Sequence, residues 1–215
     1  MKPKLLLLDC DSTLSSIEGI DELAHLRGPD VYREVVEQTN RAMNGELPID
    51  QTFELRLQLI QPDADACCKV AMRYLENLAP HVEQTIELLR GRGWTPIVVS
   101  GGFVQVIGPL AQRLGIDRIE AVPLRFHPDG RYAGYDSDYP TTRNGGKAEV
   151  VRQLREELHP ERVVMVGDGI SDLETVGEVD LFVGFTGFVR RQQVVDRAAV
   201  VIDSFEQLPA LLETA

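Results

Sequence analysis

Two short segments, each following an apolar run of the sequence, contain closely spaced pairs of aspartates. Asp9 and Asp11 follow the first run, and their spacing lets both carboxylates point to one side of an extended chain. Asp168 and Asp172 lie in the segment 167–172, whose glycines free the backbone and whose spacing puts Asp172 in the first turn of a helix. Four converging carboxylates would repel one another unless a cation lay among them, and such oxygen ligands suit Mg²⁺. Taken alone, the first pair is also compatible with turn residues at the end of a strand.

Two other segments contain groups that could bind the oxygens of a phosphate. Ser100 and the backbone amides of Gly101 and Gly102 can donate hydrogen bonds to phosphoryl oxygens. Lys147 follows two glycines at the start of a helical pattern and adds a positive charge. Together with Mg²⁺ and an aspartate, these groups favour phosphoryl transfer through an aspartate nucleophile.

The elements that must position these groups alternate along the chain. Short apolar runs end in Asp, Ser or Gly and are followed by helical patterns, which is typical of a parallel sheet covered by helices on both faces. The expected strands are 5–8, 96–99, 119–122, 163–166, 181–183 and 199–202. The expected helices are 82–89, 104–114, 147–158, 172–176 and 189–197. We therefore predict a doubly wound, Rossmann-like α/β fold, in which ligands bind beyond the carboxyl ends of the strands.

Two segments depart from this alternation. Residues 15–80 contain no convincing strand, only helical patterns interrupted by glycine and proline, and we predict that they form an inserted helical cap. The α/β core then comprises residues 1–14 and 81–215. The polar and aromatic pattern of residues 124–135 surrounds an Asp-Gly pair and predicts a small β-hairpin flap.

The amino-acid composition limits the classes of partner that we expect for this protein. The 215 residues include 34 acidic and 22 basic ones, for a net charge of −12, and without a Lys/Arg cluster nucleic acid is not an expected partner. No apolar run approaches the roughly 20 residues of a membrane helix. The three cysteines form neither a disulfide framework nor a zinc-binding spacing. We therefore expect a cytoplasmic protein without a membrane partner, and the oligomeric state stays open, with a homodimer as one alternative.

The motifs, taken in order, resemble the four motifs of the haloacid dehalogenase superfamily of phosphatases. They are Asp-x-Asp-x-Thr at 9–13, Ser-Gly-Gly at 100–102, Lys147 and Gly-Asp-Gly-x-Ser-Asp at 167–172. Further segments resemble the phosphoserine phosphatase family within that superfamily, namely 17–24, 41–43, 59–62, 145–147 and 191–193. The resemblance spans nearly the whole chain and includes the cap, where substrate specificity resides in this superfamily. Asn44 and Ile49 depart from the family, which commonly has a glycine and an aromatic residue there.

For the core, the resemblance implies a set of catalytic roles. Asp9 would be the nucleophile that forms an aspartyl-phosphate, and Asp11 would protonate the departing alcohol and later activate water. Mg²⁺ would be bound by the Asp9 carboxylate, the Asp11 backbone carbonyl and Asp168, while Asp172 would hold metal-bound water or Lys147. Lys147 would neutralise charge on the phosphoryl group.

For the cap, the resemblance implies recognition of an amino acid. Glu18 would receive the substrate ammonium and Arg56 its α-carboxylate, while Met43 would pack over the substrate and Ser171 would contact the ligand. The implied reaction is Mg²⁺-dependent hydrolysis of the small phosphomonoester O-phospho-L-serine to L-serine and phosphate, in serine biosynthesis. The alternatives are the same chemistry on another small phosphomonoester, or transfer of the phosphoryl group from phosphoserine to homoserine.

Structural interpretations compete with these roles in the cap. Ser15-x-x-Glu18 fits a capping box, which the pattern alone favours, and only the family resemblance reverses that order. Arg56 falls on an apolar helical stripe, so its side chain could extend outward or face a closed cleft, and the spacing favours neither. Met43 is of a type more often found in cores.

Outside the cap, Ser171 could cap the helix that follows it. Arg190 and Arg191 are given no site role.

Two other classes of protein are alternatives. A signalling receiver domain that accepts phosphate on an aspartate shares the acidic strand ends and a lysine, but it is far shorter and lacks a helical insertion after the first strand. A catalytically silent scaffold is disfavoured by the intact acidic motifs and Lys147.

Overall fold

A six-stranded sheet forms the centre of the molecule. The structure is a computed structural model that describes residues 2–44, 46–47 and 49–214, without the side chains of Met43, 49–51 and Thr214. The strand order is β3-β2-β1-β6-β7-β8, and all neighbouring strands are parallel. The strands are β1 (Lys4–Leu8), β2 (Trp94–Phe103), β3 (Arg118–Val122), β6 (Arg162–Gly167), β7 (Leu181–Phe185) and β8 (Val200–Ile202). This arrangement confirms the predicted doubly wound α/β fold.

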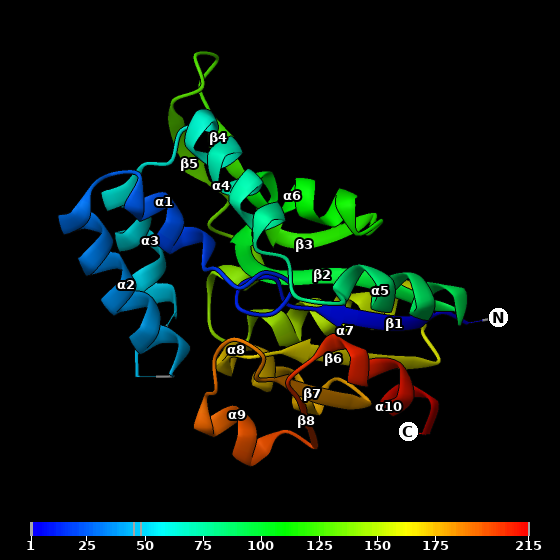
Figure 1. Ribbon diagram of the computed structural model, residues 1–215. Helices are drawn as coiled ribbons and strands as arrows, with labels where there is room; N and C mark the ends of the chain where they lie inside the picture. The colour runs from blue at the N-terminus through cyan, green and yellow to red at the C-terminus, as the bar shows by residue number, and fades with distance from the viewer. Residues whose placement is uncertain (1, 45, 48, 215) are drawn as a thin grey trace.

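Helices cover both faces of the sheet (Figure 1). Successive residues of β1 point to opposite faces, so that Leu6 and Leu8 join one buried cluster and Leu5 and Leu7 join the other. A strand that is buried on both faces has a continuous apolar sequence, which is why residues 5–8 were recognised as a strand. The first cluster includes side chains from α5 (Val82–Gly91), α6 (Val104–Arg113) and α10 (Leu208–Thr214). The second includes side chains from α7 (Gly146–Leu158), α8 (Ile170–Leu173) and α9 (Gln192–Arg197).

Four helices occupy the described part of the segment 15–80, between β1 and α5. They are α1 (Gly19–His25), α2 (Pro29–Met43), α3 (Ile49–Ile60) and α4 (Ala64–Glu76). Helices α1, α2 and α3 project beside the sheet, whereas α4 runs back and packs against α6 (Figure 1). The Asp63 side chain caps α4 by accepting a hydrogen bond from the Ala66 amide at 2.8 Å. The described part of this segment contains no strand beyond an isolated bridge, as expected, and the division at residues 14/15 and 80/81 stays a prediction.

The expected hairpin is present as the antiparallel pair β4 (Leu124–Phe126) and β5 (Tyr132–Tyr135). Gly130, in the turn, has a φ of 84°, a region that favours glycine. Its carbonyl accepts a hydrogen bond from the Ala64 amide at 2.9 Å, so the hairpin is attached to the beginning of α4. The flap therefore lies against the helical segment.

Most predicted boundaries are correct to within two residues, but three elements differ more clearly. Residues 100–102 belong to β2 rather than to a loop after it, and the pairing with β3 shifts register between Val99 and Phe103. The helix expected from residue 189 begins at Gln192, after extended backbone at Arg191. The helix expected over 172–176 is divided between α8 and the 3₁₀ turn Glu174–Gly177. The remaining 3₁₀ turns are Pro140–Thr142 and Phe205–Gln207.

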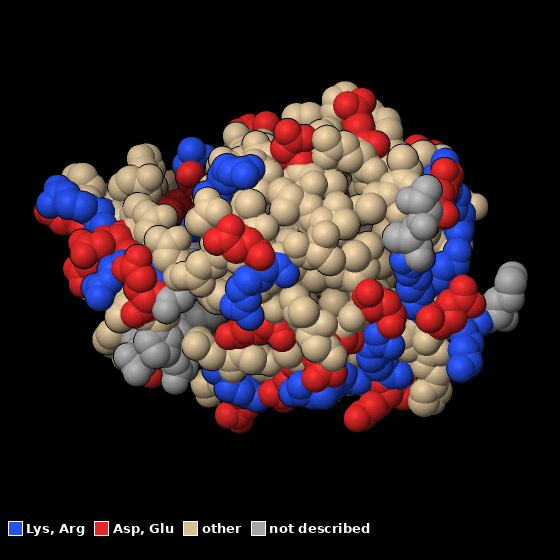
Figure 2. Space-filling view, turned by 90° about the horizontal axis from the view of Figure 1, so that it is seen from below, with Lys and Arg blue, Asp and Glu red and all other residues tan. Residues whose placement is uncertain are grey.

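Charged side chains are mixed on the surface. On the face in Figure 2, basic and acidic side chains are interspersed along the lower part, and a broad area carries neither. No helix among the described residues is long and apolar enough to cross a membrane. The cytoplasmic location and the oligomeric state stay predictions.

Candidate active site

The carboxyl ends of β1 and β6 bring acidic side chains together. These strands are neighbours in the sheet, with Leu8 paired to Val166, so Asp9 and Asp168 leave the sheet side by side. One carboxylate oxygen from each of Asp9, Asp168 and Asp172 lies within 4.8 Å of the others, and all three residues are buried. Adjacent parallel strands therefore create a cluster from residues that are far apart in sequence.

Lys147 connects two members of this cluster. Its Nζ donates to Asp9 Oδ1 at 2.7 Å and to Asp172 Oδ1 at 2.6 Å, and the side chain is only 4% exposed. Glycine is required immediately before it, because a Cβ at Gly146 would lie 1.8 Å from the Pro140 carbonyl oxygen. This close approach lets α7 begin against residues 140–142 and directs Lys147 into the cluster.

Asp172 is positioned by the glycines around Asp168. Its Oδ2 accepts a hydrogen bond from the Gly169 amide at 2.9 Å, while Oδ1 accepts from Lys147. A Cβ at Gly167 would lie 2.2 Å from the Asp172 carboxyl carbon, so glycine is needed there for space. The predicted placement of Asp172 in the first turn of a helix is therefore correct.

The cluster carries more negative than positive charge. Burial raises the pKa of Asp9 to about 7, with a further increase from Asp172, while Lys147 opposes both. Burial and the Asp9 charge also raise the pKa of Asp168 well above its usual range. Burial lowers the pKa of Lys147, but Asp172 and Asp9 outweigh that effect and raise it overall. Buried carboxylates of this kind are stabilised by an added cation, and all-oxygen donors match Mg²⁺.

Asp11 faces the helical segment instead of the cluster. Its Oδ1 accepts hydrogen bonds from the Gly19 amide at 2.6 Å and from the Tyr74 hydroxyl. Burial raises the pKa of Asp11 to about 8, and the charges of Glu18 and Asp9 add to this increase. A carboxyl group with such a pKa can carry a proton near neutral pH.

Ser100 and its two glycines lie at the end of β2. Ser100 Oγ accepts a hydrogen bond from the Gly102 amide at 3.0 Å, so this amide is already engaged. The expectation that the amides of Gly101 and Gly102 donate hydrogen bonds to phosphoryl oxygens stays a prediction. Ser171 is buried beside them in the same pocket, and the N-cap of its helix is Gly169, so Ser171 does not cap that helix.

Glu18 occupies the N-cap position of α1 but makes no side-chain capping bond. Its Oε1 accepts a hydrogen bond from Ser12 Oγ at 2.7 Å. Ser15 Oγ instead donates to the Asn77 carbonyl at 3.1 Å. The capping-box interpretation is therefore wrong, and the Glu18 carboxylate lines the pocket.

Arg56 points into the interior and does not extend outward. The residue is 3% exposed, its NH1 donates to Thr39 Oγ1 at 3.1 Å, and its Nε donates to the Thr52 carbonyl at 3.2 Å. Burial lowers the pKa of Arg56, while the charge of Asp21 opposes that effect. The Met43 side chain lies outside the described residues, as does that of Ile49.

One cavity of about 50 Å³ receives most of the predicted site residues. Core and helical-segment residues line it from opposite sides. The predicted residues among them are Asp9, Asp11, Glu18, Arg56, Ser100, Gly101, Gly102, Lys147, Asp168 and Ser171. Asp172 adjoins it through Lys147. The lining that sequence reasoning missed comprises Ile20, Phe53, Phe103, Thr141 and Arg143.

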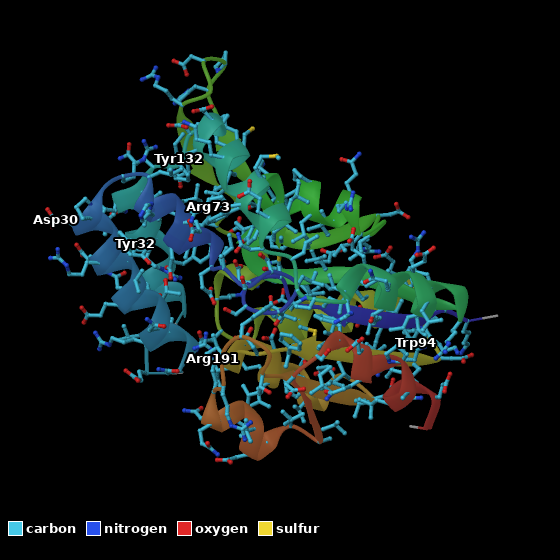
Figure 3. The ribbon with its side chains drawn as sticks, viewed as in Figure 1. Asp30, Tyr32, Arg73, Trp94, Tyr132 and Arg191 are labelled. Carbon is cyan, nitrogen blue, oxygen red and sulfur yellow. The ribbon has the colours of Figure 1, made fainter. Side chains whose placement is uncertain are left out.

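Arg191 is a further residue that sequence reasoning missed. Its Nε donates to Asp168 Oδ2 at 3.1 Å, and its NH2 lies 3.7 Å from Glu18 Oε1. The side chain lies just before α9, beside α8 (Figure 3). Nothing in the spacing distinguishes Arg191 from the exposed Arg190, since the difference arises from how the segment after β7 returns to the site.

The fold and this pocket define a class of enzyme. Residues 3–180 match the family model of haloacid dehalogenase-like hydrolases. The chain therefore belongs to the haloacid dehalogenase-like hydrolases, and it is a phosphatase.

Similar proteins place the chain in a more specific family of phosphatases. The chain is 39% identical over 207 residues to phosphoserine phosphatase from Mus musculus, covering 95% of this chain and 91% of the relative. It is 38% identical over 204 residues to a chloroplastic phosphoserine phosphatase from Arabidopsis thaliana, covering 93% of this chain and 68% of the relative. A solved substrate-bound phosphoserine phosphatase complex superimposes with a TM-score of 0.86 at 26% identity, covering 98% of this chain and 99% of the other. Within the hydrolases, the chain belongs to the phosphoserine phosphatase family.

Proposed function

We propose that this chain hydrolyses O-phospho-L-serine to L-serine and phosphate through a phosphoryl group carried on Asp9. The observation that carries the proposal is the distribution of charge in one pocket. Lys147 lies at its core side, and Glu18 and Arg56 lie on the side of the helical segment. A phosphate at the core side would leave the ammonium and carboxylate of the amino acid beside opposite charges.

The first half of the reaction exchanges one phosphorus–oxygen bond for another. An Asp9 carboxylate oxygen attacks phosphorus, and the bond from phosphorus to the serine oxygen breaks. Asp11 gives its proton to the departing serine oxygen, for which its raised pKa suits it. Lys147, bonded to Asp9 at 2.7 Å, keeps positive charge beside the transferring group.

The second half restores the enzyme. Asp11, now ionised, removes a proton from a water molecule as that water attacks phosphorus. The bond between phosphorus and the Asp9 oxygen breaks, which releases phosphate and regenerates both carboxyl groups in their starting states. The buried pocket limits the access of other water molecules.

The acidic cluster fits Mg²⁺ as the cofactor. The Asp9 carboxylate, the Asp11 backbone carbonyl and Asp168 would hold it, and Asp172 would orient Lys147. When bound, Mg²⁺ supplies positive charge that stabilises the negative charge of the phosphoryl group. Arg191 fixes the Asp168 carboxylate from the other side. In a cell, we place the reaction in serine biosynthesis.

A comparison of phosphate esters tests the substrate. O-Phosphoethanolamine lacks the carboxylate of phosphoserine, and phosphoglycolate lacks its ammonium group together with the carbon that bears it. Each lost charged hydrogen bond is expected to lower kcat/KM by roughly 10- to 150-fold, the equivalent of about 1.5–3 kcal/mol. Equal kcat/KM for phosphoserine and phosphoglycolate would reject the substrate assignment. Formation of phosphohomoserine when homoserine is added would instead show phosphoryl transfer.

A further inference from the structure

Tyr74 contacts Asp11, a pocket residue, from a helix that sequence reasoning treated only as part of the cap. It lies on α4, is completely buried, and donates its hydroxyl proton to Asp11 Oδ1. Neither the motifs nor the apolar pattern of α4 distinguishes this tyrosine from a core residue. The contact matters because Asp11 is the residue to which the proposed function assigns proton transfer.

The two oxygens of Asp11 have different surroundings. Oδ1 accepts hydrogen bonds from both the Gly19 amide, at 2.6 Å, and Tyr74. Oδ2 faces the end of β2, since a Cβ at Gly102 would lie 3.0 Å from it. Gly102 lines the pocket, so the oxygen without those two donors is the one directed toward the substrate site.

Gly19 provides an independent sign that the Tyr74 contact is built into the fold. A Cβ at this position would lie 2.2 Å from the Tyr74 hydroxyl oxygen and 3.4 Å from Asp11 Oδ1. The backbone of Gly19 is helical and does not need glycine for its conformation. Glycine is therefore needed for space, and any larger side chain would separate the phenol from the carboxylate.

Helix α4 holds the phenol rigidly. Cys67, Val70, Ala71 and Tyr74 form one buried stripe, and α4 packs along α6. Arg73, the preceding residue, forms an ion pair with Glu22 of α1 (Figure 3). The same helix is thus packed on the core, paired with α1 and bonded to Asp11.

We propose that Tyr74 is the positioning residue for Asp11. By occupying Oδ1 together with the Gly19 amide, it fixes the rotation of the carboxyl group, and the proton is then offered from Oδ2 toward the leaving oxygen. This inference rests on the proposed function of Asp11 as the acid. It assigns Tyr74 no contact with substrate and no proton of its own to transfer.

The test compares two leaving groups in the Tyr74→Phe variant. With enzyme in excess over substrate, the rate of alcohol release reports the first half-reaction alone. Serine oxygen needs a proton to leave, so its release from O-phosphoserine is expected to slow about 10- to 100-fold, the range for a misplaced catalytic group. p-Nitrophenolate leaves without a proton, so its release from p-nitrophenyl phosphate is expected to change less than about twofold. The KM for O-phosphoserine should also stay within about twofold of the wild-type value.

Two further variants separate positioning from packing. Gly19→Ala should reproduce the unequal slowing, because its methyl group displaces the phenol while Tyr74 is kept. Tyr139→Phe is the matched control, since that phenol also donates to a carboxylate, Glu120, but outside the pocket lining. It should leave both release rates unchanged. Thermal unfolding of each variant establishes that the compared proteins are folded.

Equal slowing of both esters in Tyr74→Phe, or unchanged release of both, would overturn the inference. A purely structural tyrosine would lower the unfolding temperature without making the rate depend on the leaving group. If the wild-type enzyme prefers a different alkyl phosphate to O-phosphoserine, the substrate proposal fails. The Tyr74 comparison then proceeds with that alkyl ester, so the two failures are distinguishable.

Discussion

Different interactions position the residues on the two sides of the pocket. On the core side, Lys147 donates hydrogen bonds to both Asp9 and Asp172. Asp9 follows a strand, and the other two residues lie in the first turns of α7 and α8. On the other side, Arg56 is held by Thr39 and by a carbonyl of its own helix, so its position depends on how helices pack. Charge networks therefore fix the chemical end of the site, and helix packing fixes the end proposed to recognise the substrate.

This difference predicts separable effects. A change on the core side should remove the reaction itself, and some core changes should also destabilise the fold. A change among α1, α2 and α3 should alter which substrate binds while the chemistry continues.

Replacing the nucleophile should have the largest effect on activity. Asp9→Asn leaves an amide that cannot attack phosphorus, so Mg²⁺-dependent phosphate release is expected to fall to background. Folding should survive, because burial already disfavours the charged form of Asp9. Phosphate release and urea unfolding should be measured on the same preparation. Retained turnover would show that another group accepts the phosphoryl group.

Removing Lys147 should damage both activity and stability. Lys147→Met leaves Asp9 and Asp172 buried without their shared cation, at an expected loss of about 3–5 kcal/mol in the free energy of unfolding. Urea unfolding in Mg²⁺-free buffer measures this loss. Lys69→Met removes an exposed lysine on α4 and should leave the free energy of unfolding nearly unchanged. Similarly small losses of unfolding free energy in both variants would contradict the interpretation that charge interactions stabilise the core side of the pocket.

Sequence reasoning succeeded where topology alone decides position. Neighbouring parallel strands must end at the same edge, so Asp9 and Asp168 had to converge once their strands were recognised. The glycines around Asp168 were expected only to free the backbone, whereas Gly146 and Gly167 are needed for space, because a Cβ at either position would meet Pro140 or Asp172.

The side of the pocket formed by the helical segment was less predictable, because contacts between residues far apart in the sequence determine its geometry. The capping pattern at Glu18 misled, since Ser15 bonds to Asn77 instead. The spacing of Arg56 left two directions open until α2 supplied Thr39 as a partner. Tyr74 could not be distinguished from a core residue, because its partner Asp11 lies 63 positions away in the sequence.

Changing Arg56 should alter recognition and leave the chemistry intact. In Arg56→Ala the KM for O-phosphoserine is expected to rise roughly 10- to 100-fold, because a charged hydrogen bond to the carboxylate is lost. The KM for O-phosphoethanolamine, which has no carboxylate, should change little, and kcat for both esters should be largely kept. Steady-state kinetics on the two esters measures this contrast.

Arg33→Ala provides the control for loss of a positive charge among these helices, because Arg33 is exposed on α2. It should leave both KM values unchanged. An equal rise for the two esters in Arg56→Ala would mean that Arg56 supports the fold of the pocket instead of binding a carboxylate.

The smallest effect is expected at Asp21. Its carboxylate accepts a hydrogen bond from the Thr39 hydroxyl at 2.7 Å, and Thr39 in turn accepts one from Arg56. Burial raises the pKa of Asp21 from 3.8 to about 6. Between these two pKa values the folded protein retains a proton at Asp21 that the unfolded chain loses. This contribution to the free energy of unfolding is complete below pH 3.8 and is lost as the pH rises through about 6.

Asp21→Asn abolishes the titration and should make the loss of stability between pH 4 and pH 7 smaller by about 1–3 kcal/mol. Urea unfolding of both proteins in Mg²⁺-free buffer measures the difference, and Asp30→Asn, at an exposed position on α2, should leave the wild-type profile unchanged. Identical profiles for Asp21→Asn and the wild type would show that Asp21 stays ionised in the fold, as a direct partner of Arg56 and not a neutral support behind it.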